Sequence, residues 1–387
     1  MGDEPQCARR GATLYGAAGE VIVETAQPPE MISFAAGQPA IRSFAAEALR
    51  RLCDRQVTAR TEDANPHGAI EGYRPLRQWV AAAHGADVSN VLITSGSRQG
   101  LDLIANAFIS PGCKVLVEAP TRSEALQAFS ACRPTFAEIP GDERGLQPQW
   151  LTEDLAANAR FLYTMPDFQD PTGRRLSGER RRQLVTLAHA HGVLLVEDNS
   201  YGDLRYRDTA LPSLYSMNPA GVIHLGSWSE LFSPRLPLGY IIAPQALHDR
   251  IVQAKRKLKL HTPECLQHAG YRLLESGTLQ REICAVRDQY GRQCSAMLKA
   301  LSRYMPLGVR WTAPHGGMFI WIELPSTINA EALLDDALAR NVSFAPGACF
   351  HAAARTPNTL RLNFVAVAPE NIDRGAALLG GLITRHL

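Results

Sequence analysis

Short apolar runs alternate with helix-forming stretches through the middle of the chain. Five runs are almost continuously apolar: residues 91–94, 114–118, 161–164, 193–197 and 222–225. Amphipathic segments lie between them, for example residues 177–191, with Leu184 and Leu187 on one face and Gly192 as a stop signal. Continuous apolar strands joined by amphipathic helices predict a mostly parallel sheet covered by helices on both faces.

The pattern changes after residue 243. A helical stretch runs from 245 to about 301, and strand-like runs follow at 317–322 and 360–364 before a closing helix. This order is typical of a smaller α+β domain. We therefore predict three parts: an N-terminal arm (1–42), a large α/β domain (43–245) and a small C-terminal α+β domain (246–387).

Composition and charge exclude several classes of protein. The chain has 387 residues, is 45% apolar and carries a net charge of +2, so it can build two cores but offers no large basic surface. No apolar run approaches the roughly 20 residues of a membrane span, and no signal peptide begins the chain. Its eight cysteines show no metal-binding spacing. We expect a cytoplasmic protein with no metal, nucleic-acid or membrane partner.

Several motifs stand beside the predicted strands. They are Phe34 to Pro39, Gly68 to Arg77, Thr94-Ser95-Gly96-Ser97-Arg98-Gln99, Pro171-Thr172-Gly173, Glu197-Asp198-Asn199-Ser200-Tyr201, Gly226 to Tyr240, and Arg361 to Phe364. Together, and over nearly the whole chain, they resemble the class I aminotransferases, which are fold-type I pyridoxal-phosphate (PLP) enzymes. The resemblance implies a seven-stranded, mainly parallel sheet in a large domain, a smaller C-terminal α+β domain, and a two-fold homodimer with its clefts near the interface.

The resemblance also implies roles for retained residues. Ser97 and Arg98 lie in the turn that presents backbone N–H groups to a phosphate. Asp198 matches the aspartate that pairs with the pyridinium nitrogen of PLP, and Tyr201 matches the tyrosine three residues later. Arg361 lies where the family grips a substrate α-carboxylate with two parallel hydrogen bonds. Two serines of the cofactor-lysine loop are also kept, Ser227 and Ser229.

Six positions depart from the family pattern. The chain has Glu230 for the PLP lysine, Pro237 for a phosphate-binding arginine, Arg235 for glycine, Asp170 for an asparagine, Arg122 for the ring-stacking aromatic residue, and His67 for a tyrosine that reaches across the dimer. A carboxylate cannot form an imine with an aldehyde, and proline has no side-chain donor.

These departures predict that no cofactor is covalently bound and that PLP binding is disfavoured. They remove two cationic anchors and add two carboxylates, and each charge is worth on the order of 1–4 kcal/mol at ~4 Å. Noncovalent binding of PLP or pyridoxamine phosphate (PMP) remains the disfavoured alternative. No other lysine is expected to take over, because Lys114 begins a strand and the rest read as surface helix positions: Lys255, Lys257, Lys259 and Lys299.

Three functions fit the sequence. The preferred hypothesis is an enzyme without a lysine-bound cofactor that acts on an amino-acid-derived carboxylate, in bacterial biosynthesis. Arg361 would anchor the carboxylate, the acid–base groups would be Glu230, Asp198 and His67, and an amine or guanidinium on the substrate would suit the acidic pocket. The second hypothesis is a non-catalytic partner subunit of an active homologue, and the third is a transferase that binds PLP or PMP noncovalently.

Each site residue also has a plainer explanation. Asp198 could be a relic held by backbone hydrogen bonds, and Arg361 could be a structural ion-pair partner. Glu230 could be a solvated loop residue, and His67 a packed loop histidine. Arg122 could be exposed, or could lie over whatever occupies the old ring site.

Overall fold

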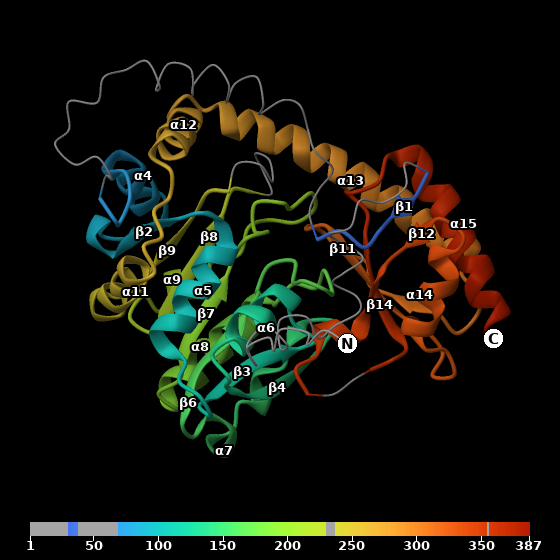
Figure 1. The fold of residues 1–387 in the computed structure, drawn as a ribbon, viewed down its shortest axis with the longest axis horizontal. Helices are drawn as coiled ribbons and strands as arrows, with labels where there is room; N and C mark the ends of the chain where they lie inside the picture. The colour runs from blue at the N-terminus through green and yellow to red at the C-terminus, as the bar shows by residue number, and fades with distance from the viewer. Residues whose placement is uncertain (1–29, 38–68, 230–236, 354–355) are drawn as a thin grey trace, which may run out of the picture.

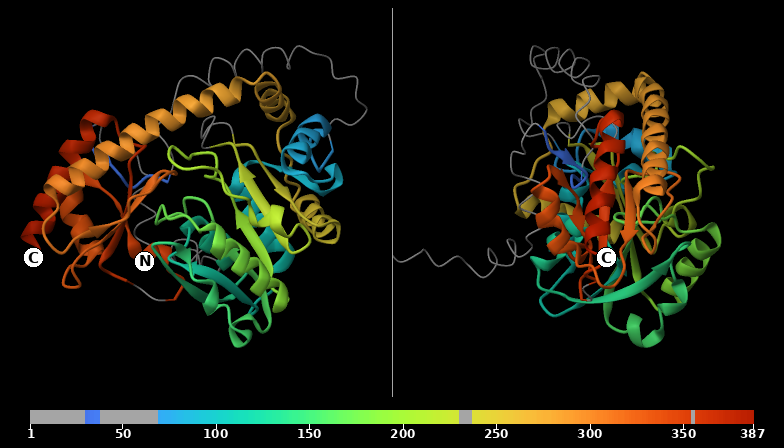
Figure 2. Two further views of the ribbon diagram at one scale, coloured as in Figure 1. Left: turned by 180° about the vertical axis from the view of Figure 1, so that it is seen from behind. Right: turned by 90° about the vertical axis from the view of Figure 1, so that its right-hand side faces the viewer.

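The computed structural model describes residues 30–37, 69–229, 237–353 and 356–387, and every structural statement below refers to these residues. Figure 1 shows a larger body with a central sheet beside a smaller one, with the long helix α13 (Thr278–Tyr304) running between them along one side. The two further views show the same arrangement from behind and from the side (Figure 2).

The large sheet contains eight strands within the described residues, in the order β2-β9-β8-β7-β6-β3-β4-β5. Their bounds are β2 (Val91–Thr94), β9 (Gly239–Ile242), β8 (Val222–Ser227), β7 (Leu194–Asp198), β6 (Ala159–Thr164), β3 (Lys114–Ala119), β4 (Thr135–Asp142) and β5 (Gly145–Leu146). Strand β9 is antiparallel to both neighbours, and β8, β7, β6, β3 and β4 are parallel. The expected mainly parallel sheet is confirmed. It has one strand more than expected because the chain turns back after β4 and pairs two residues as β5.

Helices cover both faces of this sheet. They are α4 (Arg74–His84), α5 (Gly96–Phe108), α6 (Ser123–Ser130), α7 (Glu153–Ala156), α8 (Gly178–Ala190), α9 (Leu214–Met217) and α11 (Gln245–Lys257), with short 3-10 turns at Val88–Asn90 and Pro148–Trp150. Successive side chains of a strand point to opposite faces. On β8, Leu225 lies against Gly100 of α5, whereas His224 contacts the ring of Tyr215 of α9. The continuous apolar runs of the sequence thus mark strands that are buried on both sides.

The smaller body is built on a four-stranded antiparallel sheet in the order β10-β11-β14-β13. Its elements are β10 (Arg310–Trp311), β11 (Phe319–Glu323), β13 (Ala345–Pro346), β14 (Thr359–Asn363), α14 (Ala330–Leu338), α15 (Pro369–Arg385) and the 3-10 turn η3 (Gly347–Phe350). Strand β1 (Ile32–Ser33) pairs in parallel with β12 (Val342–Ser343). The helical stretch expected from 245 is three helices, α11, α12 (Glu264–Glu275) and α13.

The proposed end of the N-terminal arm at residue 42 lies outside the described residues, and the division at 245/246 stays a prediction. Among the helices described, none is long and apolar enough to cross a membrane.

One buried arginine fixes the loop between β6 and α8. Arg181 of α8 donates hydrogen bonds of 3.0 Å to the carbonyl oxygens of Pro166, Leu176 and Pro212, and one of 2.7 Å to Asp167 Oδ1. Its side chain is fully buried. Because buried polar groups must be paired, the course of residues 165–176 depends on this guanidinium.

We expect Arg181→Met to lower the free energy of unfolding by about 3–5 kcal/mol, because it removes four hydrogen bonds from a buried site, including one of the two that Asp167 Oδ1 accepts from arginines. Urea denaturation followed by circular dichroism would measure the change. The matched control is Arg144→Met, which removes an ion pair of 2.8 Å to Glu179 in which both side chains are 59% exposed. This control should cost less than about 1 kcal/mol. Equal effects of the two substitutions would contradict the role given to Arg181.

Candidate functional site

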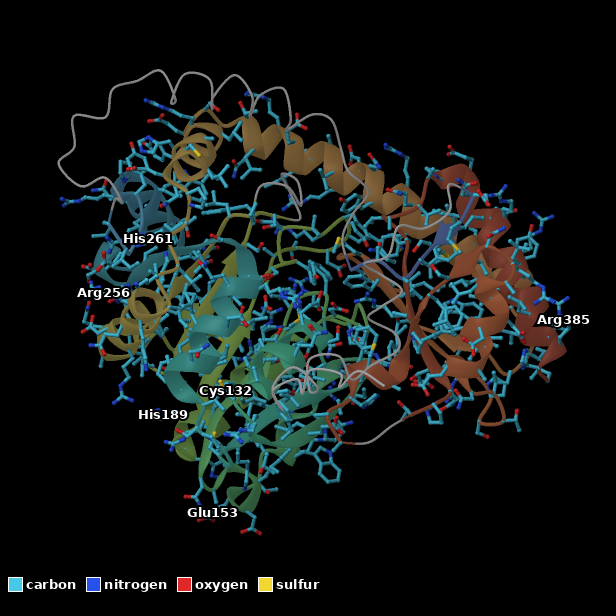
Figure 3. All side chains as sticks on the ribbon, viewed as in Figure 1. Cys132, Glu153, His189, Arg256, His261 and Arg385 are labelled. Atoms are coloured by element: carbon cyan, nitrogen blue, oxygen red, sulfur yellow. The ribbon has the colours of Figure 1, made fainter. Side chains whose placement is uncertain are left out.

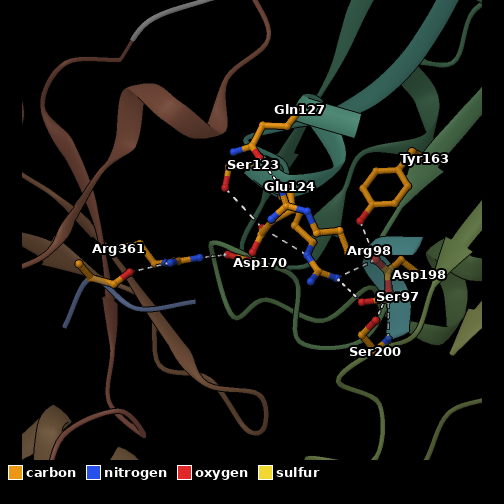
Figure 4. Close-up of polar contacts among 12 residues, drawn as sticks. Ser97, Arg98, Ser123, Glu124, Gln127, Tyr163, Asp170, Asp198, Ser200 and Arg361 are labelled. Carbon is orange, nitrogen blue, oxygen red and sulfur yellow. Dashed lines mark hydrogen bonds and ion pairs between the residues drawn. The ribbon is translucent and has the colours of Figure 1, made fainter. Parts of the chain in front are cut away.

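The candidate site lies at the carboxyl ends of the parallel strands. Asp198 is the last residue of β7, and Ser97 is in the first turn of α5, which follows β2. Arg122 precedes α6, which follows β3. The carboxyl ends of parallel strands form the usual binding edge of such sheets. Figure 4 shows Asp198 and Ser97 close together, with Arg361 of β14 in the smaller sheet pointing toward Asp170.

Asp198 is held on both of its oxygens. Its Oδ1 accepts hydrogen bonds from the backbone N–H of Ser200 (3.1 Å) and from the Ser200 hydroxyl (2.5 Å). Its Oδ2 accepts from the Tyr163 hydroxyl (2.8 Å) and from Arg122 Nη1 (3.1 Å). The carboxylate is fully buried, so its orientation is fixed before any ligand arrives.

Arg122 lies across the space between Asp198 and the start of α5. Its Nη1 also donates to Ser97 Oγ (3.3 Å), and its Nε lies 3.4 Å from Glu124 Oε2. The guanidinium carbon is 5.8 Å from the centre of the Tyr201 ring. The side chain is only 6% exposed, so Arg122 is buried beside Asp198 and does not lie on the surface.

Arg361 occupies a second buried position with an acidic partner. Its Nη1 lies 2.7 Å from Asp170 Oδ1, and its Nη2 donates to the carbonyl oxygen of Ala35 (3.0 Å). Its guanidinium carbon is 4.2 Å from the Phe319 ring centre and 4.8 Å from that of Phe350. The two rings and the acidic partner hold the guanidinium in one orientation.

The start of α5 has the features of an anion site. Gly96 has φ +80°, and a Cβ at this position would lie 3.2 Å from Ser229 Oγ and 3.8 Å from Pro237 Cβ. Ser229 Oγ is buried and has no hydrogen-bond partner within the described residues. Helix N-termini attract anions because their first N–H groups are unpaired. Pro237, at the expected arginine position, thus lies next to Gly96 but supplies no charge.

The predicted site residues divide into three groups. Contacts link the residues of the first group into one cluster: Ser97, Arg122, Asp170, Asp198, Tyr201, Ser227, Ser229 and Arg361. Arg98 is exposed, and its Nη2 donates to Gln127 (3.1 Å). The remaining three lie outside the described residues: His67, Glu230 and Arg235.

The charges of the cleft are closely coupled. Burial disfavours the ionised form of Glu124, but Arg122 and Arg361 outweigh it and hold the Glu124 pKa below its usual range. Burial raises the pKa of Asp170, and Arg361 opposes only part of that rise. The described cleft therefore joins two guanidinium groups to three carboxyl groups, and no cluster of its histidine, cysteine or acidic residues could hold a metal ion.

Sequence reasoning missed several residues of this site. Tyr163 near the end of β6 and Ser200 after β7 could have been found from their places beside the carboxyl ends of strands. Glu124 had no such signal, because its role depends on two arginines that fold around it.

The expectation that Lys255 is a surface residue is wrong. It is 1% exposed, and its Nζ donates to the Ile93 carbonyl oxygen (2.7 Å), while the adjacent Arg256 is exposed on the outer face of α11 (Figure 3). Burial lowers the pKa of Lys255 to about 8. A basic run on a helix does not reveal which of its members faces inward.

Two aminotransferases from other organisms match almost the full length of the chain. A 2-aminoadipate transaminase of Thermus thermophilus is 40% identical over 365 residues, covering 93% of this chain and 91% of that protein. An aromatic-amino-acid aminotransferase of Thermococcus litoralis is 35% identical over 379 residues, covering 95% and 90%.

A solved structure corrects our expectation about the cofactor. The α-aminoadipate aminotransferase LysN of Thermus thermophilus, complexed with N-(5'-phosphopyridoxyl)-L-leucine, is 37% identical, with a TM-score of 0.91 over 97% of both chains. The expectation that PLP is disfavoured and that no cofactor is covalently held is thus contradicted by close relatives that work with PLP. The reasoning failed because it summed the charges of the replaced side chains without their positions, whereas the structure buries Arg122 against Asp198 and Ser97.

The family follows from the whole of this evidence. The large mainly parallel sheet and the smaller α+β body are those of fold-type I aminotransferases. The profile of the aminotransferase class I and II family matches residues 29–379, and the chain belongs to this family.

Proposed function

We propose that this chain transfers an amino group between an amino acid and a 2-oxo acid with PLP or PMP as the carrier. One observation carries the proposal. A carboxylate suited to a pyridinium, Asp198, and an arginine suited to a substrate carboxylate, Arg361, are buried in one charged cluster, with Arg122 and Glu124 between them.

The residues of the cleft fit such a cofactor at both ends. Asp198 offers a fixed, buried carboxylate to a protonated ring nitrogen. The start of α5 offers backbone N–H groups and the buried Ser97, and the unpartnered Ser229 hydroxyl faces the same turn. When bound, the cofactor carries the amino group and withdraws electrons from the reacting carbon.

Arg122 takes the place of two family residues at once. It stands at the sequence position of the stacking aromatic residue, and its guanidinium lies between Asp198 and the phosphate end of the cleft. A guanidinium can stack on a ring and also attract a phosphate, whereas Pro237 can do neither. We assign to Arg122 the charge that the missing phosphate arginine would otherwise supply.

The substrate is a small amino acid or 2-oxo acid whose carboxylate binds Arg361. The relatives that act on 2-aminoadipate and on aromatic amino acids make these the first substrates to test. The three carboxyl groups of the cleft also suit a substrate that carries a second amine or a guanidinium. We further propose a homodimer, as the resemblance implies.

Glu230 is the proposed proton-transfer group. It directly follows Ser229 in the sequence, at the position where the family pattern has the PLP lysine. A carboxylate can take a proton from the substrate carbon and return it. Asp198, whose oxygens accept hydrogen bonds from Tyr163, Ser200 and Arg122, is not assigned a part in that transfer.

We expect Glu230→Gln to slow amino transfer by roughly 10²–10⁴-fold while PMP binds as before, because the amide keeps the shape but cannot accept a proton. Rapid mixing of PMP-loaded protein with 2-oxoglutarate, followed by chemical quench and mass spectrometry of glutamate, would give the single-turnover rate. The control Glu143→Gln changes an exposed glutamate and should leave the rate unchanged.

Two outcomes would contradict this scheme. A single-turnover rate that is the same in Glu230→Gln and the wild type would contradict the role given to Glu230. A protein that binds neither PLP nor PMP would refute the proposed function. Transfer that appears only after mixing with a lysine-containing homologue would instead show a partner subunit.

Arg122→Tyr restores the family's aromatic residue, yet we expect it to weaken PMP binding by at least about tenfold. Ring stacking is worth about 0.5–1.5 kcal/mol, whereas a unit charge near a phosphate is worth on the order of 1–4 kcal/mol. The dissociation constant can be measured by isothermal titration calorimetry. Arg98→Gln also removes one positive charge, but from the exposed face of α5, and should have a smaller effect. Tighter binding by Arg122→Tyr would show that Arg122 obstructs the cofactor.

A further inference from the structure

The arginine that is expected to bind the substrate is already paired with a carboxylate of the chain itself. Arg361 Nη1 and Asp170 Oδ1 are 2.7 Å apart, and both side chains are almost completely buried. Asp170 is also the position where the family pattern has a neutral asparagine. A substrate carboxylate that approaches Arg361 therefore meets a second carboxylate on the same guanidinium.

Each member of this pair has one unsatisfied atom. Asp170 Oδ2 and Arg361 Nε are buried and have no hydrogen-bond partner within the described residues. Buried polar atoms without a partner are uncommon and are costly unless a ligand or a proton completes them. The pair thus holds one free donor and one free acceptor toward a ligand.

We propose that Asp170 is a built-in competitor of the substrate, and that a ligand carboxylate binds Arg361 only together with a proton that Asp170 takes up. This inference rests on the proposed function, because it concerns the same arginine. It specifies how the site discriminates: the ligand must be a carboxylate able to displace an internal one.

The physical reason is the repulsion of two carboxylates at one cation. Two like charges about 4 Å apart cost on the order of 1–4 kcal/mol in a partly solvated site. A proton on Asp170 Oδ2 removes this repulsion, and the carboxyl group then becomes a hydrogen-bond donor, as an asparagine side chain would be. Among the described residues, the charged or titratable groups around the pair are Arg122 and Glu124 at the start of α6 and the Cys349 thiol of η3.

The direction of the pH effect follows from linkage. Burial already raises the pKa of Asp170 in the free protein, with Arg361 opposing that rise, and a bound carboxylate raises it further. Affinity should therefore be constant below the pKa of the free protein. Above that value it should fall by up to about tenfold per pH unit, until the pKa of the complex is passed.

The test is the binding of glutarate, a dicarboxylate without a reactive carbonyl, to the full chain by isothermal titration calorimetry. The series should run from about pH 6 to 9, where glutarate stays ionised. We expect the wild type to lose affinity with rising pH, and Asp170→Asn to bind at least about tenfold more tightly at neutral pH with no such loss. Asp170→Ser is a second neutral variant in case the amide disturbs folding, and the thermal melt of each variant checks its fold.

The matched control is Glu124→Gln, which removes the same charge beside the same arginine. Glu124 pairs with Arg122 and makes no hydrogen bond to Arg361, so this variant should change the affinity at every pH but keep the slope. A pH-independent affinity that is equal in the wild type and both Asp170 variants would overturn the inference and leave the proposed function intact. Failure of glutarate to bind any variant would refute Arg361 as a carboxylate site, and the inference would fall with it.

Discussion

The balance of charge inside one buried cleft is the constraint on which the rest of the site depends. Two arginines, Arg122 and Arg361, lie among three carboxyl groups, and of these five side chains only Glu124, which is 23% exposed, is partly open to water. An unpaired charge at such depth would cost several kcal/mol, so each group must keep a partner at every stage of binding. We therefore expect a charged ligand to bind by replacing one of the ionic partners that these side chains have in the free protein.

This constraint gives the family scaffold a different way of binding its ligands. Asparagine and an aromatic residue, which the family pattern places in the cleft, are neutral and leave the arginine and the aspartate open to the ligand. Here Asp170 and Arg122 supply ionic partners to both groups. The side chains of the site are thus paired with one another, and we expect the site to favour ligands that match the pattern of charge it already holds.

Much of the fold follows from local rules, but the partners within the site do not. The apolar runs predict the strands because a strand buried on both faces must be apolar throughout, and Asp198 is found from its motif at a strand end. The Asp170–Arg361 pair joins residues 191 positions apart, one in the loop before α8 and one on β14, so no local pattern reveals it. Lys255 shows the same limit, because only the packing of α11 on β2 decides which lysine is buried.

The rigid loop before α8 explains why the ion pair can act as a competitor at all. Arg181 holds the loop by donating hydrogen bonds to the carbonyl oxygens of Pro166 and Leu176 and to the carboxylate of Asp167, three residues before Asp170. A carboxylate on a freely moving loop would turn toward water when a ligand arrived, and it would lose no free energy by doing so. Because this loop is held in place, Asp170 cannot readily turn away from Arg361. Proton uptake by Asp170 then becomes the way to relieve its repulsion with the ligand carboxylate.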